Sequence, residues 1–295
     1  MAEVQAFFDP DTATVSYLVA DPATRRAAVI DPVLDFEPHA ARLSTASADA
    51  LLAVAAEQGL AIDWVLDTHA HADHLSAGDY IRAKTGARYG VGARIDQVQG
   101  VFKTLFHVDD VTPDGSAFDQ LFEDGDTFAI GALDARVIHT PGHTPACVTY
   151  LIDGVAFVGD TLFMPDYGTA RADFPGGDAR TLYRSIRRIL DLPPETRIFV
   201  GHDYPPEGRD APAWETTVAE ERAGNVHVRD AIDEDAFVAM REARDKTLAA
   251  PRLILPSLQV NIRAGRLPPP EGDGGRYLKL PINRLGGGAA DAAPW

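Results

Sequence analysis

Four potential metal ligands lie within one short segment of this chain. Residues 68–74 have the sequence Thr-His-Ala-His-Ala-Asp-His and follow a mostly apolar run, residues 62–66, that is typical of a buried strand. Three imidazoles and one carboxylate at this spacing are hard to satisfy together without a shared cation, and both groups are natural metal ligands. The alternative is a polar loop that merely happens to be rich in histidine. We predict a metal site at the end of this strand and in the loop that leaves it.

Three further residues of ligand type each follow a glycine: His143, Asp160 and His202. Glycine allows the backbone to turn sharply, so the next side chain can be directed inward. Asp160 and His202 also come just after short apolar runs. Taken singly, each is better explained by a structural role, as a hydrogen-bonded histidine or an aspartate in a turn. Together with residues 68–74 they repeat one arrangement, a ligand at a strand end, and several such ends at one edge of a sheet would assemble a metal pocket.

The composition is that of an ordinary globular protein. The 295 residues are 45% hydrophobic and 24% charged, which is enough to bury a substantial core in one large domain or two small ones. The formal net charge is -17. Because an acidic chain repels the phosphates of nucleic acids and anionic membrane surfaces, we expect neither as a partner. No apolar run approaches the roughly 20 residues of a membrane span.

The N-terminal segment and the cysteine content both favour a reducing, cytoplasmic location. Residues 1–4 show no secretory signal pattern, and a single cysteine, Cys147, excludes an intramolecular disulfide. Cys147 adjoins the apolar run 148–152, so we expect a small buried side chain there and not a nucleophile.

Strand and helix patterns alternate along the first part of the chain. Apolar runs around the turns at Pro22 and Gly154 indicate hairpins. Apolar residues at helical spacing predict helices, which we place at residues 48–60, 77–85, 93–105 and 179–190. Hairpins combined with strand–helix alternation indicate mixed sheets covered by helices.

The character of the chain changes after residue 212. Charged helices are expected over residues 214–223 and 234–246, and a tail rich in proline and glycine follows. We therefore divide the chain into a catalytic domain, residues 1–210, and a C-terminal extension, residues 211–295, that packs on the same domain. About ten residues at the end of the tail are expected to be poorly ordered.

The order of the ligand-type residues resembles the metallo-β-lactamase superfamily, in which His-x-His-x-Asp-His is followed by His, Asp and His. The resemblance implies an α/β (α+β) fold, the four-layer αββα sandwich of two mixed β-sheets, with the helical and irregular extension added to it. In members with two metals, the matching residues form two sets. One metal is held by His69, His71 and His143, the other by Asp73, His74 and His202, and both share Asp160.

Further segments resemble the persulfide dioxygenases of this superfamily more closely than glyoxalase II. They are Tyr-Gly-Thr-Ala-Arg-Ala-Asp-Phe at 167–174, Leu-Tyr-Arg-Ser-Ile at 182–186, Gly-His-Asp-Tyr at 201–204 and Thr-Val-Ala-Glu-Glu-Arg at 217–222. The resemblance implies oxidation of glutathione persulfide, or of the persulfide of a similar small thiol, by O2 to sulfite and thiol. It also implies one Fe(II) per chain, held by His69, His143 and Asp160, with the remaining coordination positions open.

The resemblance assigns roles to the residues around this iron as well. Four residues surround the iron without binding it: His71, Asp73, His74 and His202. Of these, His74 or His202 is expected to assist proton transfer. Arg171 is expected to bind a carboxylate of the thiol carrier, and Tyr183 to hydrogen-bond the same molecule. Asp173 is expected to orient Arg171 or to contact the carrier.

Two segments depart from the simplest persulfide dioxygenases. The loop 163–168 is longer than theirs, and residues 255–266 resemble a subgroup labelled β-lactamase-like hydrolase. Both segments bear on the thiol pocket, so the identity of the thiol carrier stays open.

Other functions fit the same ligand set. A dinuclear hydrolase of the glyoxalase II thioesterase type would use Zn(II), one or two ions per chain, with a metal-bound hydroxide as the nucleophile. Lactamase activity is less favoured, because Asp160 stands where the main lactamase subclass has a cysteine. A non-catalytic scaffold that senses sulfide or metal would have no need for the complete ligand set. The sequence also leaves open whether the chain forms a homodimer.

Overall fold

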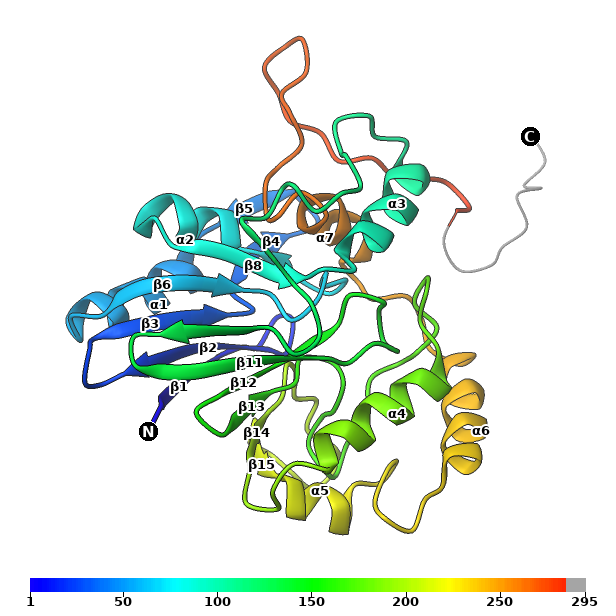
Figure 1. Ribbon diagram of the computed structural model, residues 1–295. Helices are drawn as coiled ribbons and strands as arrows, with labels where there is room; N and C mark the ends of the chain where they lie inside the picture. Colours follow the sequence, from blue (N-terminus) through cyan, green and yellow to red (C-terminus); the bar gives the residue numbers. More distant parts are fainter. Residues whose placement is uncertain (285–295) are drawn as a thin grey trace.

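Figure 1 shows the computed structural model, which describes residues 1–284. Two six-stranded β-sheets lie at its centre, and helices cover their outer sides. The first sheet has the strand order β1 (Glu3–Asp9), β2 (Thr14–Asp21), β3 (Arg26–Ile30), β6 (Ala61–Leu66), β8 (Arg88–Gly92) and β9 (Gln120–Phe122). The second sheet has the order β10 (Thr127–Ile130), β11 (Leu133–His139), β12 (Val148–Ile152), β13 (Val155–Phe157), β14 (Arg197–Phe199) and β15 (Glu215–Thr217).

Both sheets are mixed, and helices connect their parallel neighbours. In the first sheet, β3, β6, β8 and β9 run parallel, and the connections contain α1 (Ala46–Glu57), α2 (Gly78–Thr85) and α3 (Ile95–Phe106). In the second sheet only β13 and β14 are parallel, and α4 (Ala179–Leu190) connects them. Parallel strands require such crossovers, whereas the antiparallel strands are joined by shorter turns.

Alternating side chains of the strands build two apolar layers at once. In β2, Tyr17 lies in the cluster between the two sheets, and the next residue, Leu18, lies in the outer cluster that α1, α2 and α3 cover. In β13, Phe157 faces the other sheet, and Ala156 packs with Leu182 of α4. This alternation gives four layers, helix–sheet–sheet–helix, and it confirms the predicted αββα sandwich.

The C-terminal residues join both outer layers. Three helices belong to this part of the chain: α5 (Val218–Gly224), α6 (Glu234–Asp245) and α7 (Ile254–Asn261). Phe237 of α6 packs in the cluster of α4, whereas Leu258 of α7 packs in the cluster of α1, α2 and α3. A small third sheet lies beside α7 and has the order β5 (Arg42–Ser44), β4 (Val33–Glu37) and β7 (Leu75–Ser76). The end of the tail, for which we expect little order, falls outside the described residues.

The expected helix over residues 214–223 is wrong in its first turn. Residues 215–217 form β15, because they pair with the exposed edge of β14. The helix starts only at Val218, where Thr217 accepts a hydrogen bond from the Glu220 amide and the Glu220 carboxylate accepts one from the Thr217 amide. This reciprocal cap fixes the helix start. Within residues 1–284, no helix is both long and apolar enough to span a membrane.

Candidate metal centre

The predicted ligands come together where strands end at one edge of the sandwich. The segment 69–74 follows β6, and His143 lies between β11 and β12. Asp160 follows β13, and His202 follows β14. These residues fall into two neighbouring groups of potential ligands, so the structure brings together all the residues that we predicted to face a metal.

The first group consists of His69, His143 and Asp160, all of them buried. The Nε2 atoms of His69 and His143 lie 3.9 Å and 3.8 Å from Oδ2 of Asp160. Ligands that each lie about 2.0–2.2 Å from one metal are separated from each other by about 3–4 Å. The spacing in this group therefore fits a single ion.

The second group consists of His71, Asp73, His74 and His202. Nε2 of His202 lies 3.0 Å from Oδ2 of Asp73 and 3.3 Å from Oδ1 of Asp160. Asp160 therefore directs one carboxylate oxygen towards each group. This is the position from which a carboxylate can bridge two metals.

Neighbouring polar groups contact one ring nitrogen in each of four histidines and so fix the orientation of the rings. Nδ1 of His143 donates to the carbonyl oxygen of Arg171 at 2.8 Å, and Nε2 of His71 lies 3.0 Å from Oδ1 of Asp31. His69 and His74 contact threonine hydroxyls through Nδ1 at 3.0 Å and 3.2 Å. Such contacts set which ring nitrogen is free to bind a metal.

The opposite nitrogens of three rings are buried without a partner. They are Nε2 of His69, Nδ1 of His71 and Nε2 of His74. Buried polar atoms nearly always have a partner, so a group of unpaired nitrogens calls for one. A metal ion satisfies neutral imidazole nitrogens and carboxylates together, and the residues present therefore fit a metal.

The protonation of the site residues also fits a bound metal. Burial, with a contribution from neighbouring histidines, holds the pKa of His69 and His71 well below the ordinary histidine value, so both rings are neutral. Burial also raises the pKa of Asp160. Burial disfavours a charge on His202, but the carboxylates of Asp160 and Asp73 outweigh it and raise the pKa of His202 to about 10. A bound cation would take over the role of balancing these carboxylates.

A pocket of about 330 Å³ opens beside the first group and is lined by His143, Asp160 and Asp73. Its wall contains three aromatic side chains: Phe163, Tyr167 and Tyr204. The described residues that line it also include four arginines: Arg171, Arg241, Arg244 and Arg252. The metal groups therefore face a cavity that is large enough for a small ligand and lined by several arginine side chains.

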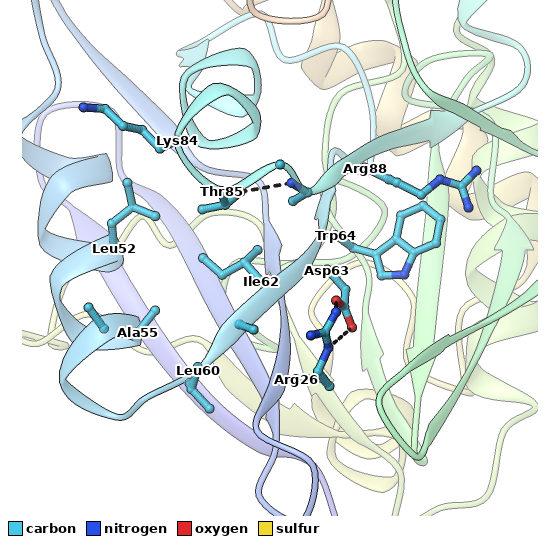
Figure 2. A pocket seen from close by; sticks show the side chains of 14 residues that line it. Arg26, Leu52, Ala55, Leu60, Ile62, Asp63, Trp64, Lys84, Thr85 and Arg88 are labelled. Carbon is cyan, nitrogen blue, oxygen red and sulfur yellow. Dashed lines mark hydrogen bonds and ion pairs between the residues drawn. The ribbon is translucent and has the colours of Figure 1, made fainter.

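A larger cavity, of about 750 Å³, lies elsewhere, between α1, α2 and the first half of β6 (Figure 2). Apolar side chains such as Leu52 and Ile62 line one side of it, and Arg26 pairs with Asp63 on the other. None of the predicted metal ligands lines this cavity. The chemistry-bearing residues lie at the other end of β6, so size alone does not identify the site.

The predicted carrier-binding residues separate into two places. Arg171 lines the pocket and pairs with Asp173 through both Nε and Nη2, at 2.5 Å and 2.8 Å. Asp173 thus orients Arg171, which is one of the two roles we expect for it. Tyr183 does not line the pocket. Its hydroxyl donates to the carbonyl oxygen of Ile232 at 2.9 Å, because the chain before α6 folds over α4 and covers it.

Two supporting residues were missed from the sequence. Asp31 accepts hydrogen bonds from both the amide and the hydroxyl of Thr68 and also contacts His71. It therefore supports His71 directly and His69 through the hydroxyl of Thr68. Its position at the end of β3 repeats the pattern of a polar residue after a strand, which is a usable signal. The second missed residue is Asn261, at the end of α7. No sequence pattern links it to the site.

Comparisons with known proteins agree with this geometry. Residues 9–202 match the family described as Metallo-beta-lactamase superfamily. The chain is 55% identical over 293 residues to a probable metallo-hydrolase of Burkholderia pseudomallei, covering 96% of this chain and 99% of that protein. It is 52% identical to a beta-lactamase hydrolase-like protein of Xylella fastidiosa, where the match covers 97% of this chain but only 66% of the longer relative.

Persulfide dioxygenases are also among the similar proteins. The chain is 32% identical over 270 residues to the mitochondrial persulfide dioxygenase ETHE1 of Bos taurus, with 90% of each chain covered. The crystal structure of ETHE1 from Myxococcus xanthus matches with a TM-score of 0.72 and 31% identity, covering 90% of this chain and 100% of that one. On the family match and these relatives together, the chain belongs to the metallo-β-lactamase superfamily.

Proposed function

We propose that this chain is a mononuclear non-haem iron dioxygenase that oxidises the persulfide of a small thiol such as glutathione. The reaction consumes the persulfide, O2 and water and releases the thiol and sulfite. The observation that carries the proposal is the group of His69, His143 and Asp160. Two histidines and one carboxylate form the ligand set of non-haem Fe(II) oxygenases, which leaves coordination positions open for substrates.

Iron in this group would activate O2 and offer a position for the persulfide sulfur, whose oxidation to sulfite supplies the electrons that reduce O2. The residues of the chain would orient the ligands, place the substrate and assist proton transfer. The carbonyl oxygen of Arg171 holds the ring of His143, and the pocket walls bring the substrate to the side of Asp160. His202 lies between Asp73 and Asp160, and Nδ1 of His74 lies 3.6 Å from the same carboxylate of Asp73. Either ring is placed to assist proton transfer to the products.

The charges around the pocket support an anionic thiol carrier. In a chain with a net charge of -17, arginines gather around this one pocket. Arg171 and Arg241 already pair with Asp173 and Asp245. Within residues 1–284, Arg244 forms no ion pair, so its charge is free for a carboxylate of the carrier. Tyr183 has no part in the proposed site.

The second candidate is a dinuclear zinc hydrolase that cleaves thioesters. The observation that favours it is the completeness of the second group, together with the position of Asp160 between the two groups. A metal-bound hydroxide would then attack the substrate carbonyl. The similarity to a probable metallo-hydrolase is also consistent with this function.

Metal loading and substrate choice distinguish the two functions. Metal-free protein is loaded with Fe(II) without oxygen, or with Zn(II), and each sample is analysed for bound metal. Glutathione persulfide with O2 and a glutathione thioester are then offered to both samples. The proposal predicts oxygen uptake and sulfite formation by the iron sample. Thioester hydrolysis by the zinc sample, without oxygen uptake by the iron sample, would favour the hydrolase. Metal binding without either reaction would favour a sensing scaffold.

A further inference from the structure

The end of α7 packs against residues 69–74, the segment between β6 and β7 that carries four of the potential ligands and that we call the metal loop. The side chain of Asn261 is 1% exposed. Its Oδ1 accepts a hydrogen bond from the amide of Ser76, and its Nδ2 donates to the carbonyl oxygens of His71 and His74, all at 2.8 Å. One side chain from the C-terminal part therefore holds three backbone groups that lie 185 to 190 residues earlier in the chain.

The metal loop has little other backbone support. Outside helices and strands, no backbone–backbone hydrogen bond within residues 1–284 involves an amide or carbonyl of residues 69–74. Regular pairing resumes only at β7, where Leu75 and Ser76 pair with β4. Two of the three hydrogen bonds of Asn261 thus fall on residues whose side chains are potential metal ligands, His71 and His74.

The surroundings of Asn261 are shaped to this loop. Leu258, Val260 and Ile262 are buried in the same cluster as Leu75, so α7 is anchored on the core at this point. Gly265 follows with a φ of +75°, and a Cβ atom there would lie 2.8 Å from the carbonyl oxygen of Ser76. Any side chain at this position would push the two segments apart.

We propose that Asn261 is a positioning residue of the metal centre, so that the C-terminal part of the chain sets the affinity and geometry of the metal bound by the loop. The amide fixes the backbone of His71 and His74 and thereby the direction of their metal-facing nitrogens, and it also locks the neighbouring Asp73. This inference rests on the proposed metal centre, in which His71 and His74 surround the iron held by the first group, or bind a second metal themselves if the second group is occupied.

Two variants test the role of the amide. Asn261→Ala removes all three hydrogen bonds. Asn261→Asp keeps the size of the side chain and the acceptor for the Ser76 amide, but it replaces the donors to His71 and His74 by a carboxylate oxygen. The matched control is Gln99→Ala, because Gln99 is equally buried and its amide also anchors the C-terminal part, donating to the carbonyl oxygen of Ile262 at 2.9 Å. Gln99 does not contact the metal loop.

The readouts are the affinity for Co(II) and Zn(II) by competition with a chelator, the visible spectrum of the Co(II) form, and thermal unfolding of the metal-free protein. We expect metal binding about 10–100-fold weaker and an altered Co(II) spectrum in both Asn261 variants, as for other residues that orient metal ligands. Gln99→Ala should lower thermal stability but bind metal as the parent does.

Three results would overturn the inference. Parent-like affinity and spectrum in folded Asn261 variants would show that the residue is structural only. Equal losses of affinity in Gln99→Ala would assign the effect to general destabilisation. Failure of both Asn261 variants to fold, while Gln99→Ala folds, would make Asn261 a folding anchor. If the parent itself binds no Co(II) or Zn(II), the proposed metal centre fails, and that result is distinct from the other three.

Discussion

Asp160 and His202 join the two groups of potential ligands into one centre. Oδ1 of Asp160 lies 3.3 Å from Nε2 of His202, while Oδ2 lies 3.9 Å and 3.8 Å from Nε2 of His69 and His143. The same carboxylate can therefore complete a single-metal site or bridge two metals. One metal at this carboxylate would favour the dioxygenase, and two metals would favour the hydrolase.

Asp160→Ala should abolish metal binding and activity together. The substitution removes the only carboxylate of the first group and leaves two neutral imidazoles, which hold Fe(II) weakly. The check is metal analysis after gel filtration, with Asp235→Ala as the control because Asp235 is an exposed acidic residue on α6. Iron at full occupancy in Asp160→Ala would contradict the ligand assignment.

Arg171→Ala should weaken substrate binding while leaving the metal in place. Arg171 pairs with Asp173 through Nε and Nη2, so it would contact a carrier carboxylate through its remaining N–H groups. Such a charge-assisted hydrogen bond contributes about 1.5–3 kcal/mol, so KM for glutathione persulfide should rise about 10- to 100-fold. Steady-state kinetics and metal analysis on the same samples separate the two effects. Arg180→Ala, on the outer surface of α4, is the control. Unchanged kinetics in Arg171→Ala would remove Arg171 from the substrate site.

Arg244→Ala should change the preference among thiol carriers. Arg244 reaches the pocket from α6 and forms no ion pair within the described part of the chain. Its side chain is exposed to solvent, so dissolved salt screens its charge. We expect KM for a carboxylated persulfide to rise about two- to tenfold at low salt, and less at high salt. The persulfide of an uncharged thiol should be unaffected. An equal loss with both substrates would argue against a carboxylate contact.

Stability should fall in mild acid because of His227. This ring is 8% exposed, and its Nδ1 accepts a hydrogen bond from the amide of Thr169, in the pocket wall, at 3.1 Å. Burial lowers the pKa of His227 to about 4, below its ordinary value of 6.5. The unfolded chain therefore binds a proton at a higher pH than the folded one. The contribution of His227 to the free energy of unfolding is fully present above about pH 6.5 and is lost as the pH falls towards 4.

The loss from His227 should amount to about 2 kcal/mol by pH 4. Chemical unfolding of the metal-free protein at several pH values measures it. His227→Gln, which cannot gain a proton, should show a flatter pH dependence than the parent between pH 6.5 and 4. Parallel pH profiles for parent and variant would assign the acid sensitivity to other groups.

The sequence predicted that the ligand-type residues lie together, because their pattern is local, although His71 falls in the second group and not with His69 and His143 as the two-metal resemblance implies. The histidine segment directly follows a buried strand, and His143, Asp160 and His202 each follow a glycine at a turn. Strand ends of one sandwich meet at one edge, so local patterns suffice to bring these residues together. The alternation of strands and helices indicated mixed sheets covered by helices, and the resemblance to the metallo-β-lactamase superfamily implied the four-layer sandwich.

Contacts between distant segments could not be predicted in this way. Asn261 lies in an ordinary short helix, and only tertiary packing brings it to His71. Tyr183 matches a family motif, yet the chain before α6 covers its hydroxyl. Residues 215–217 have the charge pattern of a surface helix but form a strand, because the edge of β14 offers backbone partners. In each case, a partner far along the chain decides the outcome.

The most direct test of the proposed function is a comparison of oxygen consumption with sulfite formation. Protein loaded with Fe(II) without oxygen, and containing about one iron per chain, is mixed with glutathione persulfide and O2. Iron-treated Asp160→Ala serves as the blank. The proposal predicts that the parent consumes O2 and forms sulfite in equal molar amounts, while the blank does neither. Oxygen consumption by the parent no greater than that of the blank would contradict the assignment of this chain as a persulfide dioxygenase.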